Sequence, residues 1–234
     1  HVITRMIRGG AQKNTLSTVI GLKEKGYEVT LVTGPSWGHE EEVLSEAFHQ
    51  GVNILIIPEL VREIDPFKDL IALQKLSSLM EKCSFDMVHT HTSKAGILGR
   101  LAAFKSKCPA VIHTPHGHVF HSYFSRWKEE IFIWLERQMA KRTDRLIALT
   151  VKCRNEHLEF EVGRLKQWAV IPSGIDEKSL TDYSRERDQI LKELNIPPSR
   201  KIIGFIGRFA PVKGPSYLAS ALPYIYWEKL DFHC

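Results

Sequence analysis

The chain has 234 residues, of which 43% are hydrophobic, 25% charged and 9% aromatic, and its net charge is +5. This composition excludes a disordered, collagen-like or coiled-coil protein. No apolar run approaches the roughly 20 residues that cross a bilayer, so we expect no transmembrane helix. We also expect no signal peptide, and because the first residues resemble the end of a strand, we expect residues to have been lost before His1.

Short apolar runs rich in Val, Ile and Leu alternate with longer amphipathic segments. Brief runs that are apolar on both faces are typical of buried parallel strands. The predicted strands are residues 1–4, 28–33, 52–57, 87–88, 110–113, 146–149 and 169–171. Helical spacing predicts helices over residues 15–25, from Pro66 to about Met80, over 93–107 with Ser93 as its cap, and over 127–139. This alternation predicts an α/β fold with a Rossmann-like, doubly wound parallel sheet.

The pattern changes after residue 180. Residues 181–200 are polar and contain Pro197-Pro198, which indicates a linker between domains. Lys201–Ile206 then predicts a new strand, and Gly214-Pro215 predicts a helix start. We therefore predict a first domain over 1–180, a linker over 181–200 and, over 201–234, the first strand and helix of a truncated second Rossmann-like domain.

The charge is unevenly distributed. No carboxylate occurs between Asp86 and Glu129, a stretch that contains lysines, arginines and several histidines. Such a stretch predicts a locally positive surface or simply a solvated basic face. The four cysteines are too widely spaced for a zinc or redox motif, so we expect free thiols in a cytoplasmic protein.

Glycines and histidines follow the predicted strands at the edge where ligands of parallel sheets bind. Gly9-Gly10 precedes a helix, whose N-terminus favours an anion, although a tight turn explains the glycines equally well. His89, His91, His116 and His118 lie after two other strands, and imidazoles can exchange protons near neutral pH. Their spacing also suits a metal, but no carboxylate accompanies them, so we expect no metal site.

A pair of cations accompanies the strand predicted after the linker. Arg208 follows Gly207, and Lys213 comes just before the predicted helix start. A guanidinium and an ammonium beside a helix N-terminus are suited to a diphosphate, and solvated surface charges are the alternative. Phe120, Tyr123 and Phe124 are candidates for an apolar acceptor surface or a membrane contact, and we expect Trp127 to pack in the core.

Taken together, these motifs resemble the family-4 retaining glycosyltransferases. The resemblance covers residues 1 to 220 and rests on Gly9-Gly10-Ala11-Gln12, residues 89–94, residues 113–117, residues 171–176 and Gly207-Arg208 with Lys213-Gly214. It implies a two-domain GT-B architecture with an acceptor domain first and a nucleotide-sugar domain second. It also implies sugar transfer without a metal or other cofactor.

By that resemblance His116 would contact the transferred sugar at the reacting centre, and Gly10, Arg208 and Lys213 would bind the donor diphosphate. Fixed cations would stabilise the charge that builds on the leaving group. The other candidates, for the acceptor, are Gln12, His91, Lys94, His118 and Phe120. The expected partners are a nucleotide-diphosphate sugar and a saccharide or lipid-linked acceptor in polysaccharide or glycolipid synthesis, with contact to the inner membrane face and no nucleic acid.

One family motif is missing, because the Glu-x7-Glu pair of the donor domain would lie beyond residue 234. We therefore expect this chain to be a fragment with little or no transferase activity of its own. Two alternatives remain: a GT-B-like nucleotide-sugar epimerase, which needs carboxylates in its cleft, and a non-catalytic anion-binding remnant.

Overall fold

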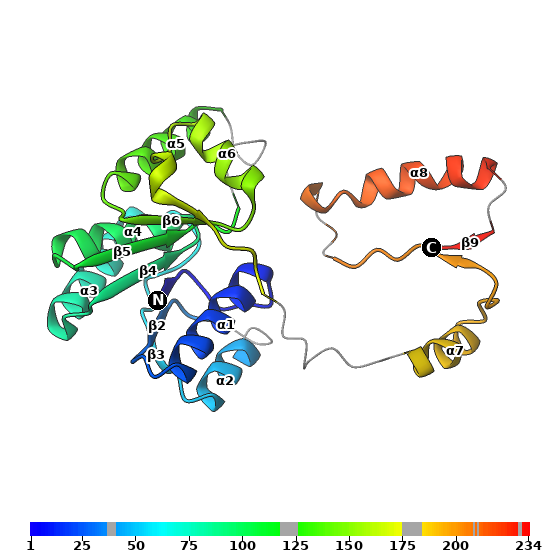
Figure 1. Ribbon diagram of the computed structural model, residues 1–234, viewed down its shortest axis with the longest axis horizontal. Helices are drawn as coiled ribbons and strands as arrows, with labels where there is room; N and C mark the ends of the chain where they lie inside the picture. Colours follow the sequence, from blue (N-terminus) through cyan, green and yellow to red (C-terminus); the bar gives the residue numbers. More distant parts are fainter. Residues whose placement is uncertain (37–40, 118–125, 175–183, 208, 210, 229–230) are drawn as a thin grey trace. The chain divides into compact units, whose positions relative to one another are not determined.

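The computed structural model describes residues 1–36, 41–117, 126–174, 184–207, 209, 211–228 and 231–234. The chain divides into two compact units, residues 1–174 and 175–234. The first unit contains a seven-stranded parallel sheet with strand order β3-β2-β1-β4-β5-β6-β7 (Figure 1). Its strands are β1 (Val2–Ile3), β2 (Thr30–Thr33), β3 (Asn53–Ile56), β4 (Met87–His91), β5 (Ala110–Thr114), β6 (Arg145–Ala148) and β7 (Trp168–Val170).

The seven predicted strands and the doubly wound α/β fold are thus confirmed. The helices of this unit are α1 (Gly10–Glu24), α2 (Glu41–His49), α3 (Pro66–Cys83), α4 (Ser93–Lys105), α5 (Arg126–Ala140) and α6 (Val151–Glu159). Among these, α2 and α6 were not predicted. Within the described residues, no helix is both long and apolar enough to cross a membrane.

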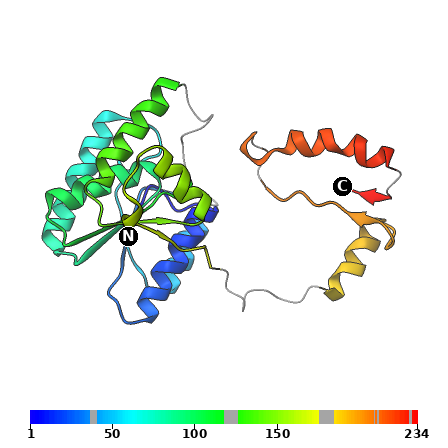
Figure 2. The same ribbon diagram turned by 45° about the horizontal axis from the view of Figure 1, so that its top comes forward.

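Helices cover both faces of the sheet (Figure 2). We call the face of the sheet that α1 and α2 cover the front face, and there these helices pack over Ile3 and Leu31. On the back face, α3 and α4 pack over Val2 and Val32, and α5 adjoins α4. Since successive strand residues point to opposite faces, the two clusters together bury both faces of the central strands.

Local sequence explains where the helices begin. Asp65 caps α3 because its Oδ1 accepts from the backbone N–H groups of Phe67 and Lys68 at 3.1 Å, with Pro66 at the first helical position. The prediction that Ser93 caps α4 is wrong. The N-cap is Thr92, which has φ 64° and ψ 171° and makes no side-chain capping bond.

The second unit contains α7 (Ser184–Glu193), the short parallel pair β8 (Lys201–Ile202) and β9 (Phe232–His233), and α8 (Pro215–Trp227). Helix α7 lies inside the predicted linker, and β8 is shorter than the predicted strand. Strand β9 gives β8 a partner, and α8 continues through Pro223, which the sequence did not indicate. The division into domains at residues 180 and 200 stays a prediction.

Candidate active site

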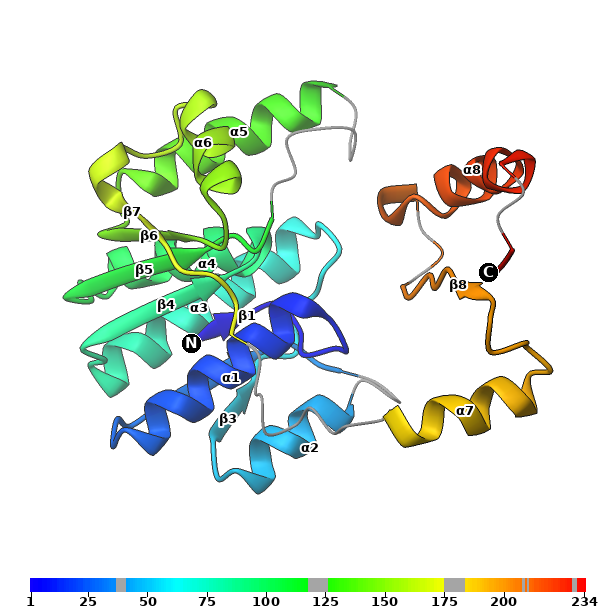
Figure 3. The same ribbon diagram turned by 45° about the vertical axis from the view of Figure 1, so that its right-hand side comes forward.

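The strand order reverses between β1 and β4, so the crevice for a ligand opens at the carboxyl ends of these two strands. Strand β4 runs three residues further than predicted, to His91. Val2 of β1 pairs with Thr90 of β4, and both belong to the back face. His89 and His91 therefore point to the front face, on either side of Thr90. Figure 3 shows β1 and β4 at the centre of the twisted sheet.

Four imidazoles gather at this place. His91 Nδ1 lies 2.9 Å from His116 Nε2, and His91 Nε2 lies 3.0 Å from His1 Nδ1. The ring of His89 lies beside that of His91, with centroids 4.1 Å apart and planes inclined by 33°, and its Nε2 lies 2.8 Å from the hydroxyl of Thr114. His116 comes two residues after β5 and has φ 58°, a left-handed backbone that positions its ring over β4.

The rings of His89, His91 and His116 are neutral at physiological pH. Burial lowers the pKa of His116 from 6.5 to about 4 and that of His89 to about 3. Burial also holds the pKa of His91 well below its usual range, and the neighbouring imidazoles lower it further. A neutral imidazole has one donor and one acceptor nitrogen, so a ring with a nitrogen that is not already hydrogen-bonded can orient a hydroxyl or a carbonyl.

The same rings are candidates for a metal. One ring nitrogen from each of His1, His89 and His91 lies within 4.8 Å of the others. A hydrogen bond already joins His91 Nε2 and His1 Nδ1. The expectation that the protein uses no metal stays a prediction.

The glycine loop comes before α1 at the same edge of the sheet. Gly9 is the N-cap of α1. Because glycine has no side chain, the N-cap residue offers no side-chain acceptor to the first N–H groups of the helix. A Cβ added to Gly10 would meet nothing within 4 Å, which leaves open space beside this backbone. Gln12 instead donates to the carbonyl of Arg5 at 3.3 Å, which ties its amide to the loop.

Two cations of the stretch without carboxylates, Lys94 and Arg100, are engaged elsewhere. Lys94 pairs with Asp69 of α3 and donates to the carbonyl of Glu63, so its ammonium points towards α3. Arg100 is fully buried and binds both carboxylate oxygens of Glu136 at 2.8 and 2.9 Å. The acid-free stretch is therefore less positive on the surface than its composition predicts.

The other candidates lie in the second unit or outside the described residues. Lys213 ends the short 3-10 helix before α8. Its side chain lies near Gly207, because a Cβ added to Gly207 would be 4.0 Å from Lys213 Cγ. Arg208, His118 and Phe120 are outside the described residues. Their predicted roles, like those of Gly10, Gln12, His91, Lys94, His116 and Lys213, stay predictions.

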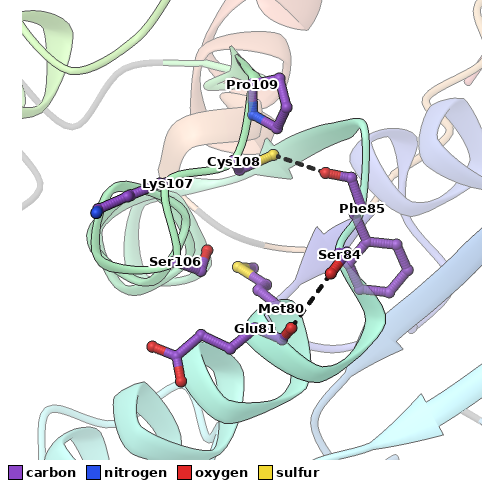
Figure 4. A pocket seen from close by; sticks show the side chains of 8 residues that line it. All are labelled: Met80, Glu81, Ser84, Phe85, Ser106, Lys107, Cys108 and Pro109. Atoms are coloured by element: carbon purple, nitrogen blue, oxygen red, sulfur yellow. Dashed lines mark hydrogen bonds between the residues drawn. The ribbon is translucent and has the colours of Figure 1, made fainter.

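A pocket of about 210 Å³ lies at the opposite, amino-terminal edge of the sheet, between the ends of α3 and α4 (Figure 4). Its Cys108 thiol donates to the carbonyl of Phe85 at 3.4 Å, and burial raises the pKa of this thiol. The thiol is therefore protonated and a poor nucleophile. This pocket is remote from the histidines and has no part in the candidate site. All four cysteines are free, as predicted.

Sequence comparison decides the family. The profile of Glycosyltransferase Family 4 matches residues 8–179. The chain belongs to this family. A UDP-Gal:α-D-GlcNAc-diphosphoundecaprenol α-1,3-galactosyltransferase of Escherichia coli is 32% identical over 234 residues, which is 98% of this chain and 58% of that protein.

Solved structures agree on the fold. The Anabaena protein HepE, crystallised with UDP and glucose, has a TM-score of 0.73 at 17% identity over 95% of this family-4 chain and 56% of its own. A UDP-N-acetylglucosamine 2-epimerase has a TM-score of 0.51 at 22% identity over 72% of this chain and 47% of its own. The chain thus spans less than two thirds of each of these relatives. The epimerase shares the architecture, whereas the family profile assigns the chain to Glycosyltransferase Family 4.

His1 was not among the candidates from the sequence, and His89 was named only with the other histidines after the strands, without a role in binding the donor or the acceptor. Strand alternation over residues 1–3 and 89–91 would have placed both on the same face as His91. The alternation of side chains was not applied to residues 89–91 because the predicted fourth strand ended at Val88.

Proposed function

We propose that the whole protein transfers a sugar from a nucleotide-diphosphate donor to a saccharide or lipid-linked acceptor with retention of configuration and without a metal. The observation that carries this proposal is the pair His91–His116 at the switch point of a family-4 sheet. The E. coli relative is named for a UDP-Gal donor, and HepE was crystallised with UDP and glucose. UDP-sugars are therefore the first donors to test.

In this proposal His116 contacts the transferred sugar. Its neutral ring can hydrogen-bond a hydroxyl without adding positive charge next to the oxocarbenium-like centre. The backbone at Gly10 approaches the diphosphate, where the open N–H groups of α1 favour negative charge. Arg208 and Lys213 neutralise the leaving nucleoside diphosphate as the bond to the sugar breaks. The acceptor hydroxyl bonds to the anomeric carbon of the sugar and gives its proton to the oxygen of the departing diphosphate.

The activity test uses the whole protein with labelled UDP-sugars and a polyprenyl-diphosphate-linked saccharide, each assayed with and without EDTA. We expect transfer that survives EDTA, gives a product with retained configuration and falls by roughly 100-fold or more in His116→Ala. The matched control is His49→Gln on α2, which changes an exposed histidine outside the site. Absence of transfer, or full activity in His116→Ala, contradicts the proposal.

Calorimetric titration of the 234-residue chain with UDP, GDP and plain diphosphate tests the two-domain mechanism separately. We expect tight nucleotide binding only in the whole protein. Tight binding of UDP by the 234-residue chain itself would contradict a donor site that requires the rest of a second domain.

A membrane contact fits the lipid-linked acceptor, and α5 is its candidate among the described residues. Trp127, Ile131 and Trp134 form one stripe along this helix, and they are 60%, 47% and 57% exposed. The prediction that Trp127 packs in the core is therefore wrong. Arg126 and Lys128 flank the stripe, and the Lys128 ammonium lies 5.3 Å from the Trp127 ring centroid. Exposed aromatic groups beside cations suit an anionic lipid surface.

Sedimentation with vesicles of phosphatidylglycerol and phosphatidylcholine tests this contact. We expect the double variant Trp127→Ser/Trp134→Ser to lose most of the binding, whereas Phe48→Ser, which removes an exposed aromatic ring from α2, keeps it. Equal binding by both variants, or no binding by the parent protein, contradicts the role of α5.

A further inference from the structure

His1, His91 and His116 form a continuous hydrogen-bonded chain on the front face. His91 occupies its middle, with one nitrogen on His116 at 2.9 Å and the other on His1 at 3.0 Å. His91 is 1% exposed, and its ring contacts the rings of both His89 and His1, whose centroids lie 4.1 and 5.2 Å away. Its orientation is therefore fixed by packing as well as by hydrogen bonds.

Because the His91 ring is neutral, its two nitrogens determine whether the neighbouring nitrogens of His116 and His1 donate or accept. One nitrogen of His91 must donate and the other must accept, so His116 Nε2 and His1 Nδ1 have opposite roles. The chain has only two such arrangements, and each fixes which nitrogen of His116 carries the proton. The state of His116 is thus coupled to that of His1 through His91.

His116 has one nitrogen left for a ligand. Among the described residues, its Nδ1 has no hydrogen-bond partner, although it is buried within the protein. An unpaired buried nitrogen is costly unless a ligand satisfies it. Because His91 holds Nε2, the free Nδ1 points to a defined place and offers either a proton or a lone pair.

The geometry points to His91 as a positioning residue that fixes the ring orientation and the tautomer of His116 for the sugar, and not as a group that binds the acceptor. This inference rests on the proposed function of His116. It assigns to His91 an effect on the transfer step, whereas an acceptor-binding role would change the concentration of acceptor that the enzyme needs.

Two substitutions separate the two hydrogen bonds of His91. The amide of His91→Asn occupies the place of Nδ1, so it retains a partner for His116 and loses the one for His1. The amide of His91→Gln reaches the place of Nε2, so it retains the partner for His1 and loses the one for His116. Both remove the same ring from the core, and each therefore serves as the folding control for the other.

The first readout is steady-state kinetics of the whole protein. We expect His91→Gln to lower kcat by roughly 10- to 100-fold with little change in the KM for donor or acceptor, and His91→Asn to retain most of the parental kcat. Equal rates in the two variants, or a rise in the acceptor KM as the main effect, overturn the inference.

The second readout is the ring ¹⁵N shifts of His116, assigned with His116→Gln. We expect one tautomer in the parent protein and in His91→Asn, and averaged shifts in His91→Gln, because neither nitrogen of His116 is then fixed. Unchanged shifts in His91→Gln overturn the inference. If no form of the protein transfers sugar, the proposed function fails, while these shifts still decide the positioning role.

Discussion

Two histidines on neighbouring strands differ in their surroundings: His91 lies at the candidate site and His113 lies in the core. His91 at the end of β4 faces the front, where it joins other imidazoles at the switch point. His113 on β5 faces the back, where its Nδ1 lies 2.9 Å from the hydroxyl of Thr90 and its ring abuts Gly96 of α4. On the front face, His91 is hydrogen-bonded to His116, whose buried Nδ1 has no partner among the described residues. On the back face, His113 lies under a helix beside a buried ion pair. The same side chain is thus part of a site or part of the core according to the face to which its strand position assigns it.

The largest loss of stability is expected for a substitution of Arg100, on the back face of the sheet. Replacing this arginine by methionine leaves Glu136 buried without its partner, which should lower the free energy of unfolding by about 3–5 kcal/mol. Urea denaturation measures the loss. The double variant Arg100→Met/Glu136→Leu removes both charges and should recover most of the stability. A small loss in the single variant would show that the back face is less closed than the structure indicates.

The next effect tests how tightly α4 covers His113. A Cβ at Gly96 would lie 2.5 Å from His113 Cε1, so Gly96→Ala should destabilise the protein by about 1–3 kcal/mol. Gly21→Ala in α1 is the matched control. Nothing lies within 4 Å of its new Cβ, and alanine favours a helix, so it should be neutral or stabilising by up to about 1 kcal/mol. Similar melting temperatures for the two variants would contradict the close packing.

On the front face, His116 should make stability depend on pH. Its pKa is about 4 in the folded protein and 6.5 when exposed, so the unfolded chain binds the proton more readily and acid favours unfolding. Between pH 7 and 5 the parent protein should lose about 2 kcal/mol more than His116→Gln, from the linkage of this one pKa. Parallel curves of unfolding free energy against pH for the two proteins would contradict the buried neutral ring.

The smallest effect concerns Lys94. Its pair with Asp69 is partly exposed, so Lys94→Met should reduce stability by about 1 kcal/mol or less. If the pair is only structural, the KM for the acceptor in the whole protein should not change. A clear rise in that KM would instead support the predicted acceptor-binding role.

Much of the fold could be predicted because its signals are local. Brief runs such as Val52–Ile57 and Ala110–His113 predicted the strands, and Pro66 marked the start of a long amphipathic helix. The helices α2 and α6 were missed, and the ends of β4 and β8 were misjudged. A polar residue in a strand continues the ladder when tertiary contacts bury it, as Thr90 and His91 do, and no local rule reports this.

The candidate site was predicted in part. The motifs around Gly10, His91 and His116 could be found because each lies at or after the end of a strand, and a parallel sheet brings strand ends together. Lys94 shows what such reasoning lacks, since its position suggested an acceptor contact but its ammonium lies on Asp69, a residue 25 positions earlier in the chain. Sequence spacing does not reveal a partner on another helix.

The sequence by itself determined the α/β alternation, the family and the residue types at the ends of the strands, because these depend on hydrophobic periodicity and on motifs within a few residues. Only the tertiary structure decided that His1 and His89 join His91, that Arg100 is neutralised by Glu136 and that Trp127 is exposed. These outcomes depend on the order of the strands and on which face each side chain enters. Both are properties of the folded sheet, and a one-residue shift in a strand would reverse them.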